Sequence, residues 1–186
     1  MRETIVDRAY AKTLLPPRKE DGHKGDFGKL LVLGGSVGYT GAPYLAASAA
    51  VHSGCGLVYL GVPESIWAVE AQKCVSAMPF PLPETDGRLC LAALDKMQDK
   101  LKGCDVLALG PGLGRGKETE QLVHALLWQV KEPLVLDADG INALSGHIDL
   151  LDARRGRPTV LTPHEVEFAR IGGDLSRGDR ERAAQD

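Results

Sequence analysis

The residue types best suited to chemistry stand together in the segment 162–167 (TPHEVE). A histidine can hydrogen-bond a ligand or transfer a proton near neutral pH, and a carboxylate can orient water around Mg²⁺. If a helix begins at the proline, His164 and Glu167 lie three residues apart on one of its faces. A structural alternative is a capping box, with Thr162 as the N-cap and Glu165 as its partner. The two interpretations use different residues, so both stay open.

Glycine-rich turns follow two short apolar runs. The run 29–33 leads into 34–43 (GGSVGYTGAP), and the run 105–109 leads into 110–118 (GPGLGRGKE). Glycine lets a ligand approach the backbone, and a helix that starts after such a turn offers free N–H groups and a positive dipole end. Both turns therefore predict loops that bind an anionic or amide-bearing ligand. The structural alternative is a turn that only needs a positive φ.

The second of these turns is not a nucleotide-binding P-loop. That motif needs four residues between its glycines, and only three separate Gly112 from Gly116. Glu118 also stands where the motif has the Ser or Thr that binds Mg²⁺. A P-loop hydrolase is therefore not expected, and a glycine-lined ligand loop remains the prediction.

Two carboxylates follow a third apolar run, 134–136. Asp137 and Asp139 stand two residues apart, and Asn142 comes three residues after the second of them. Such a pair at the end of a strand can hold a hydroxyl group, a ribose or a hydrated Mg²⁺ ion. The alternative is that Asp139 caps the helix that follows, which would leave only one carboxylate for a ligand.

These loops need secondary structure that brings them together. Short apolar runs alternate with amphipathic or alanine-rich segments, which predicts an α/β fold with a mostly parallel sheet and helices on both faces. We expect strands at 29–33, 56–62, 74–78, 105–109, 134–136 and 159–161, helices at 42–53, 64–73, 89–102, 118–130 and 163–171, and a loop at 79–87. Sites in such folds lie at the carboxyl ends of the strands, so the loops converge on one edge and predict an enzyme.

The composition excludes several other classes. The 186 residues are 44% hydrophobic and 25% charged, with a net charge of −3, which is the mix of an ordinary globular domain. A disordered chain and a nucleic-acid partner are therefore not expected. The charged N-terminus does not resemble a signal peptide, no run is long enough for a membrane span, and the four cysteines lack zinc-site spacing. These features predict a cytoplasmic protein.

The two ends of the chain differ from its body. Residues 1–22 include Pro16-Pro17 and a charged run, and we expect a short helix followed by a loop there. Residues 23–186 are expected to form the main domain. The polar stretch 172–186 contains the start of a further helix at 177–182 but no closing element, which predicts an incomplete domain.

Taken together, the motifs resemble one family. HKGDFGK at 23–29, then LLVLGGS, YTGAPYLAASAA, HSGCGLV, GPGLG, VLDADGINAL and LTPHEVEFARI up to residue 171, is similar to the ADP/ATP-dependent NAD(P)H-hydrate dehydratases. These are ribokinase-like proteins often labelled as carbohydrate kinases. The resemblance implies repair of hydrated NADH or NADPH (NADHX or NADPHX). ADP or ATP phosphorylates the hydroxyl group on the damaged ring, and phosphate then leaves to restore NAD(P)H.

The resemblance also implies roles for individual residues. Ala42, Gly112 and His164 would contact the hydrated dinucleotide, and Glu167 would stand near Mg²⁺ through a water molecule. The rest of the cleft would be lined by Gly35, Thr40, Gly41, Gly114, Asp137 and Asn142. The resemblance further implies a homotetramer.

Two departures from the family pattern bear on activity. Glu165-Val166 stand where the family has Pro-Gly between the histidine and the glutamate. The family's Lys-Gly phosphate strand and its Gly-Thr-Gly-Asp loop, with an anion hole and the Asp expected to act as base, lie further along the chain. We therefore expect that the catalytic residue lies outside these 186 residues. The chain would then be an N-terminal part that lacks the nucleotide-binding part and is inactive alone.

Two alternative functions stay open. One is a ribokinase-like kinase that acts on a sugar or a hydroxymethylpyrimidine, although such kinases favour Asn at the position of His164 and do not typically carry the YTGAP turn. The other is a non-catalytic ligand-binding or scaffold module. Assays of hydrated NADPH repair and of phosphorylation of a panel of sugars distinguish the dehydratase from the kinase.

Overall fold

A parallel sheet of six strands organises the chain. The computed structural model describes residues 4–15, 17, 18, 20–176, 178 and 180–185. The strand order is β3-β2-β1-β6-β7-β8, and every neighbouring pair runs parallel. The strands are β1 (Lys29–Leu33), β2 (Leu57–Pro63), β3 (Met78–Leu82), β6 (Val106–Leu109), β7 (Leu134–Leu136) and β8 (Thr159–Leu161). The predicted α/β fold with a parallel sheet is confirmed.

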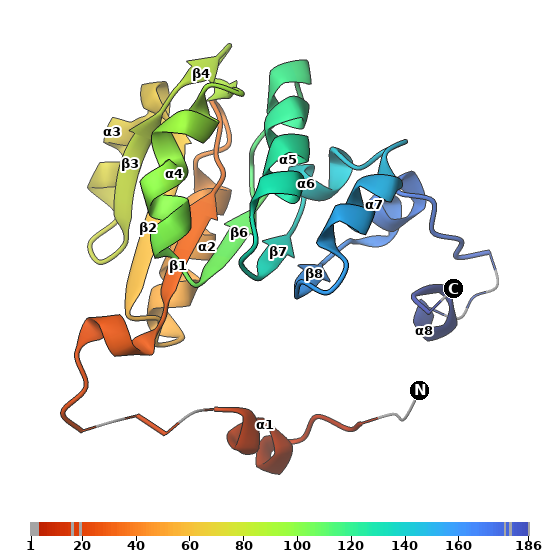
Figure 1. Cartoon of the computed structure of the whole chain (residues 1–186), viewed down its shortest axis with the longest axis horizontal. Coiled ribbons are helices and arrows are strands. Elements are labelled where there is room, and N and C mark those ends of the chain that lie inside the picture. The colour runs from red at the N-terminus through yellow and green to blue at the C-terminus, as the bar shows by residue number, and fades with distance from the viewer. Residues whose placement is uncertain (1–3, 16, 19, 177, 179, 186) are drawn as a thin grey trace.

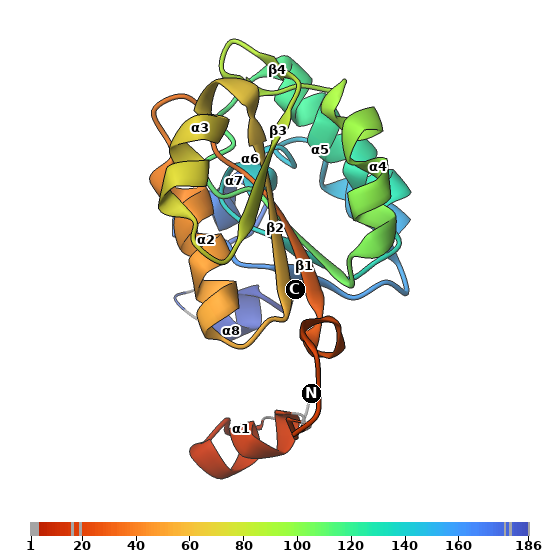
Figure 2. The same ribbon diagram turned by 90° about the vertical axis from the view of Figure 1, so that its left-hand side faces the viewer.

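Helices cover both faces of this sheet (Figure 2). On one face lie α2 (Gly41–His52) and α3 (Glu64–Lys73), and on the other lie α4 (Ala93–Gly103) and α5 (Lys117–Gln129). The remaining helices are α1 (Arg8–Leu14), α6 (Asp139–Asn142), α7 (Glu165–Arg170) and α8 (Arg180–Ala183), with 3-10 turns η1 (Lys24–Phe27) and η2 (Ile148–Arg154). None of the helices in the described part of the chain is long and apolar enough to cross a membrane.

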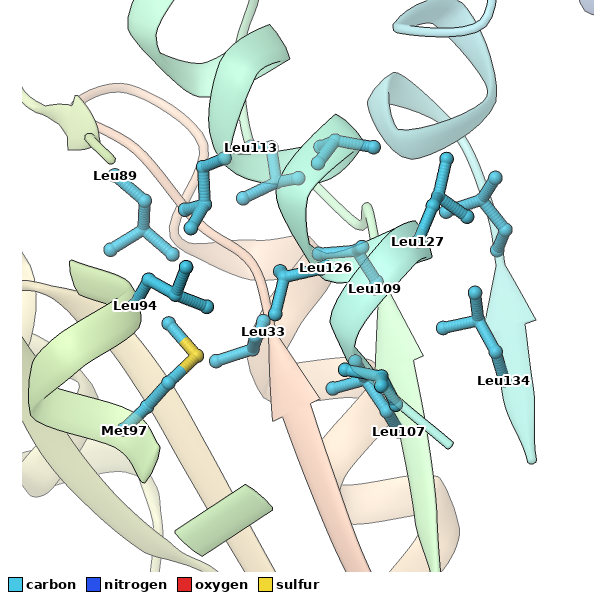
Figure 3. Close-up of a cluster of buried hydrophobic side chains, with 14 of the residues drawn as sticks. Leu33, Leu89, Leu94, Met97, Leu107, Leu109, Leu113, Leu126, Leu127 and Leu134 are labelled. Atoms are coloured by element: carbon cyan, nitrogen blue, oxygen red, sulfur yellow. The ribbon is translucent and has the colours of Figure 1, made fainter. Parts of the chain in front are cut away.

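Strand β1 is a continuous apolar run because both of its faces are buried. Leu31 and Leu33 belong to the cluster under α4 and α5, whereas Val32 belongs to the cluster under α2 and α3. All three side chains are fully buried. Figure 3 shows the larger cluster, in which Leu33 and Leu109 meet Leu126 of α5. A strand that is buried on both faces has no polar side to show, so its sequence does not alternate.

The order of the strands creates a switch point between β1 and β6. From β1 the chain crosses to β2 and β3 in one direction, and from β6 it continues to β7 and β8 in the other. The loops that leave β1 and β6 at their carboxyl ends are therefore neighbours at the carboxyl end of the sheet (Figure 1). In open parallel sheets, ligands bind at this end of the strands.

The prediction of a strand at 74–78 and a loop at 79–87 was wrong. Strand β3 (Met78–Leu82) takes the first part of the predicted loop, and a hairpin of β4 (Glu84–Thr85) and β5 (Arg88–Leu89) takes the last part. Prolines fit in β3 because it is an edge strand, where alternate residues need no partner for their backbone. The carbonyl of Pro79 accepts a hydrogen bond from Trp67 Nε1 of α3 at 3.2 Å. The helix predicted at 89–102 starts later, at Ala93, because β5 takes its first residue.

Each end of the chain carries one short helix outside the sheet and its covering helices. Helix α1 has no buried residue and stands apart from the sheet in Figure 1, which agrees with the short helix expected within 1–22. Pro16 lies outside the described residues. The helix expected at 177–182 corresponds to α8, although Arg177 and Asp179 also lie outside the described residues.

Candidate functional site

The loops that follow β1 and β6 are joined by direct contacts. The N–H of Gly35 donates to the carbonyl of Pro111 at 2.9 Å, and the hydroxyl of Ser36, which is buried, donates to the carbonyl of Gly112 at 2.8 Å. A Cβ atom at Gly34 would lie 2.4 Å from the Pro111 oxygen. Glycine is therefore required at position 34 by the close approach of the second loop.

Two of the predicted substrate-binding residues meet at this junction. A Cβ atom at Gly112 would lie 3.4 Å from the Cβ of Ala42, and the φ of Gly112 is 69°. Ala42 is exposed in the first turn of α2, and Gly41 before it has open space at its Cβ position. The first turn of α2 and the loop after β6 thus form one continuous surface at the switch point. A small side chain and bare backbone leave that surface accessible to a ligand.

The loop after β7 is locked to the loop after β6. A Cβ atom at Gly110 would lie 1.7 Å from the carbonyl oxygen of Asp137, so only glycine fits there. The N–H of Gly114 donates to Asp139 Oδ2 at 2.9 Å, and Asn142 Nδ2 donates to the other oxygen of that carboxylate at 3.1 Å. Asp139 therefore holds two loops together through its carboxylate.

The two aspartates make separate contacts in the structure. Asp137 accepts a hydrogen bond from the Thr162 hydroxyl at 2.6 Å, whereas Asp139 turns toward Gly114. Ala138 between them has a φ of 49°, which is unusual for a residue with a side chain and turns the chain sharply. The capping alternative was wrong, because Ala138 is the N-cap of α6 and Asp139 is its first residue.

His164 and Glu167 form the capping box of α7. His164 is the N-cap, and its Nδ1 accepts from the N–H groups of Val166 at 3.2 Å and Glu167 at 3.3 Å. Glu167 Oε2 accepts from the His164 N–H at 3.0 Å, and its Oε1 lies 3.2 Å from His164 Nε2. The helix therefore starts two residues later than the predicted Pro163, and a box built on Thr162 and Glu165 was wrong. The residues expected to bind the ligand and its metal are the same ones that cap the helix.

His164 follows strand β8, so it also lies at the carboxyl end of the sheet, two strands away from β6. Strands stand about 4.8 Å apart, so β8 is roughly 10 Å from β6. The connection runs from Gly110 to Asp137 and on to Thr162, two residues before His164. The imidazole lines an open groove of about 800 Å³ between β8, α7 and α8, and neither Ala42 nor Gly112 lines that groove. The structure therefore joins Ala42 and Gly112 directly and His164 only through intermediate contacts.

Magnesium has no ready site among these residues. Both oxygens of Glu167 face His164, and its side chain is buried. In the part of the chain that the structure describes, no three His, Cys, Asp or Glu side chains are grouped so as to hold a metal ion. The described residues do not fit direct metal binding, and an outer contact of Glu167 through water stays a prediction.

Arg88 was not among the residues predicted to line the site. The β4–β5 hairpin folds over the glycine loops, because the N–H of Val37 donates to the Gly87 carbonyl at 2.9 Å. A Cβ atom at Gly114 would lie 3.0 Å from Arg88 Nε, so this guanidinium borders the candidate site. The dipeptide Asp86-Gly87 was the available signal. Both residues have positive φ, which is the two-residue hairpin turn for which Asp-Gly is a strong marker.

Comparison with known proteins identifies the family. The family model described as NAD(P)H-hydrate dehydratase matches residues 30–186. The chain belongs to this dehydratase family. The bifunctional NAD(P)H-hydrate repair enzyme Nnr of Moorella thermoacetica is 45% identical over 170 residues, which cover 91% of this chain and 32% of that enzyme. The ATP-dependent (S)-NAD(P)H-hydrate dehydratase of Drosophila pseudoobscura pseudoobscura is 36% identical over 88% of this chain and 53% of its own length.

Solved structures show the same fold. A hypothetical protein from Streptococcus mutans superposes with a TM-score of 0.77 at 29% identity and covers 98% of this chain. The ADP/ATP-dependent NAD(P)H-hydrate dehydratase of Bacillus subtilis, co-crystallised with ATP and Mg²⁺, gives 0.65 at 28% identity over 95% of this chain. These matches cover 62% and 61% of the two solved chains. The chain thus spans about a third to a half of the curated relatives named above and three fifths of these structures.

Proposed function

We propose that this chain binds hydrated NADH or NADPH as the substrate-binding part of a nucleotide-dependent NAD(P)H-hydrate dehydratase. The observation that carries the proposal is the contact between the first turn of α2 and the glycine loop after β6, where Ala42 meets Gly112. This surface lies at the switch point of a parallel sheet, the usual position of a dinucleotide site. Family membership supplies the chemical identity of the ligand.

The proposed roles follow from what each residue offers. The start of α2, at Gly41 and Ala42, places backbone N–H groups and the positive end of a 12-residue helix beside the ligand surface. Gly112 contributes bare backbone on the opposite side. The Nδ1 of His164 accepts two backbone N–H groups, which puts the hydrogen of a neutral ring on Nε2, and we propose that this ring contacts the dinucleotide beyond the Ala42 and Gly112 surface.

Turnover needs more than this surface. In the proposed reaction ADP or ATP, with Mg²⁺, phosphorylates the ring hydroxyl, and loss of phosphate regenerates NAD(P)H. The described residues show no metal cluster, and the relatives are longer than the matched segment. We therefore propose that the 186 residues bind the hydrated dinucleotide and that their turnover with ADP or ATP is negligible.

The test is calorimetric titration with hydrated NADPH, followed by an absorbance assay for NADPH formation with ADP or ATP and Mg²⁺. The proposal expects saturable binding of hydrated NADPH and no turnover. Absence of binding contradicts the proposal. Phosphorylation of a sugar or a hydroxymethylpyrimidine under the same conditions supports the kinase alternative instead, and full turnover of hydrated NADPH overturns the claim of inactivity.

We further propose that the protein assembles as a homotetramer in the cytoplasm. Helix α2 is apolar almost all round, with Leu45 65% exposed and Ala49 also exposed, and such a surface favours burial in an assembly. All four cysteines are unpaired, which suits a reducing compartment. Light scattering tests the assembly, and a monomer at high concentration contradicts it.

A further inference from the structure

A buried ion pair lies behind the turn that presents Ala42. Glu70 of α3 is completely buried, and its Oε1 lies 3.0 Å from the Nζ of Lys73 one helical turn later. Its second oxygen has no hydrogen-bond partner in the described part of the chain. A buried carboxylate is costly unless a cation and hydrogen bonds compensate it. The position of the Lys73 ammonium group is therefore strongly constrained by Glu70.

The same ammonium group holds the residue before the α2 turn. Lys73 Nζ donates to the carbonyl of Thr40 at 3.0 Å and to its hydroxyl at 2.7 Å. With the bond to Glu70, all three hydrogens of the ammonium group have an acceptor. Lys73 thereby ties the last turn of α3 to the first turn of α2.

Thr40 behaves unusually for a helix N-cap. Threonine in this position normally caps the helix through its hydroxyl, but the Thr40 side chain makes no such bond to α2. The hydroxyl instead binds Lys73, 33 residues away. The orientation of the turn 40–42 is therefore set by a contact from another helix rather than by its own cap.

We infer that Glu70 and Lys73 are positioning residues that fix the turn carrying Ala42 and so determine the affinity of the site for a hydrated nicotinamide dinucleotide. This inference rests on the proposed function for its ligand. Neither side chain needs to touch that ligand. Misplacement of a binding group by about 1 Å is enough to weaken recognition.

The role is distinguishable from simple stabilisation of α3. Lys73 in the last turn of α3 would also favour that helix through its dipole, whatever lies beside it. That contribution does not depend on the Thr40 hydroxyl. A Thr40→Val variant removes one of the two Thr40 contacts and leaves Lys73 and Glu70 in place, whereas Thr40→Ser keeps both.

The test combines calorimetric titration of hydrated NADPH with amide hydrogen exchange at Tyr44 and Leu45, whose N–H groups are the first in α2 that can bond within the helix. Lys73→Met leaves Glu70 buried without its cation, so the double variant E70M/K73M is made as well, because it removes both charges. We expect about tenfold weaker binding and faster exchange in E70M/K73M. Thr40→Val should show a smaller change in the same direction, and Thr40→Ser should match the wild type.

Lys102→Met is the matched control, because Lys102 is an exposed lysine on α4 across the sheet. It removes the same charge and should alter neither measurement. The inference is overturned if folded E70M/K73M retains wild-type affinity and wild-type exchange at both amides. If the wild-type chain does not bind hydrated NADPH, the proposed function fails by itself. The exchange rates at Tyr44 and Leu45 then decide whether Glu70 and Lys73 position the turn.

Discussion

Gly112 and Ala42 touch across the boundary between two strand-end loops, with 3.4 Å between the Ala42 Cβ and the place where a Cβ at Gly112 would stand. The two residues are far apart in the sequence, and each follows one of two neighbouring strands, β1 and β6. Their contact exists because the chain reverses its crossover direction between β1 and β6. The candidate site is thus a consequence of the strand order.

Gly112→Ala should disturb this contact. The residue has a φ of 69°, and its new Cβ would lie 2.9 Å from the carbonyl oxygen of Tyr39. We expect the free energy of unfolding to fall by about 1–2 kcal/mol because of the left-handed backbone alone. We also expect weaker binding of hydrated NADPH, because the new Cβ pushes the two loops apart. Urea unfolding measures the first effect, and titration of hydrated NADPH measures the second.

Gly146→Ala is the control for that variant. Gly146 has a similar φ of 77°, but nothing lies within 4 Å of its Cβ position. It should lose only the backbone contribution and should bind as the wild type does. Equal stability losses in the two variants, with unchanged binding in both, would contradict the described contact.

Variants of His164 separate its cap from its proposed ligand contact. His164→Ala removes the acceptor for the Val166 and Glu167 N–H groups and should cost about 1 kcal/mol of stability. Asparagine is a good N-cap, so His164→Asn should keep most of the stability. If the imidazole also contacts the dinucleotide, both variants bind hydrated NADPH more weakly. Wild-type affinity in stable His164→Asn would limit this residue to capping.

Arg154 should be a strong determinant of stability. Its buried guanidinium donates to the carbonyl oxygens of Val130 and Glu132 and to the Thr159 hydroxyl, which joins the end of α5 to β8. Arg154→Met removes these three bonds, with Arg157 still donating to the Val130 carbonyl, and should cost about 2–4 kcal/mol in urea unfolding. Arg155→Met removes only an exposed pair with Asp152, so a change under about 0.5 kcal/mol is expected there. Similar losses in the two variants would count against this role.

Cys104 should make stability depend on alkaline pH. Burial, with a smaller effect from Glu132, raises the pKa of its thiol from 9.0 to about 11. The folded chain therefore holds this proton more tightly than the unfolded chain, so the stabilisation is present below pH 9 and is lost as the pH rises toward 11. Urea unfolding of the wild type and of Cys104→Ala across this range measures it. Parallel declines in the two proteins would show that the thiol contributes nothing.

The central strands could be predicted from the sequence because their burial leaves a simple pattern. The predicted run 29–33 coincides with β1, and the runs 134–136 and 159–161 coincide with β7 and β8. Strand β3 could not be predicted because it contains prolines, which indicate a loop unless the strand lies at the edge of a sheet. Whether a strand lies at an edge depends on the whole sheet and not on its own sequence. The hairpin strands have two residues each, too few to show an alternation.

The site could be predicted in part. Ala42 and Gly112 followed from motifs that resemble a family, and the glycine patterns pointed independently to the same loops. The capping box of His164 and Glu167 was missed because histidine is not among the usual N-cap residues. The bond from Lys73 to Thr40 joins residues 33 positions apart on different helices, and no local pattern marks such a contact.

The most direct test of the account is the response of backbone amide signals in an NMR titration of this 19.9 kDa chain with hydrated NADPH. We expect saturable shifts concentrated at residues 40–44 and 110–114, with much smaller shifts in α4. Saturable shifts confined to other parts of the chain, or no shifts at ligand concentrations that saturate a longer dehydratase of this family, would contradict it.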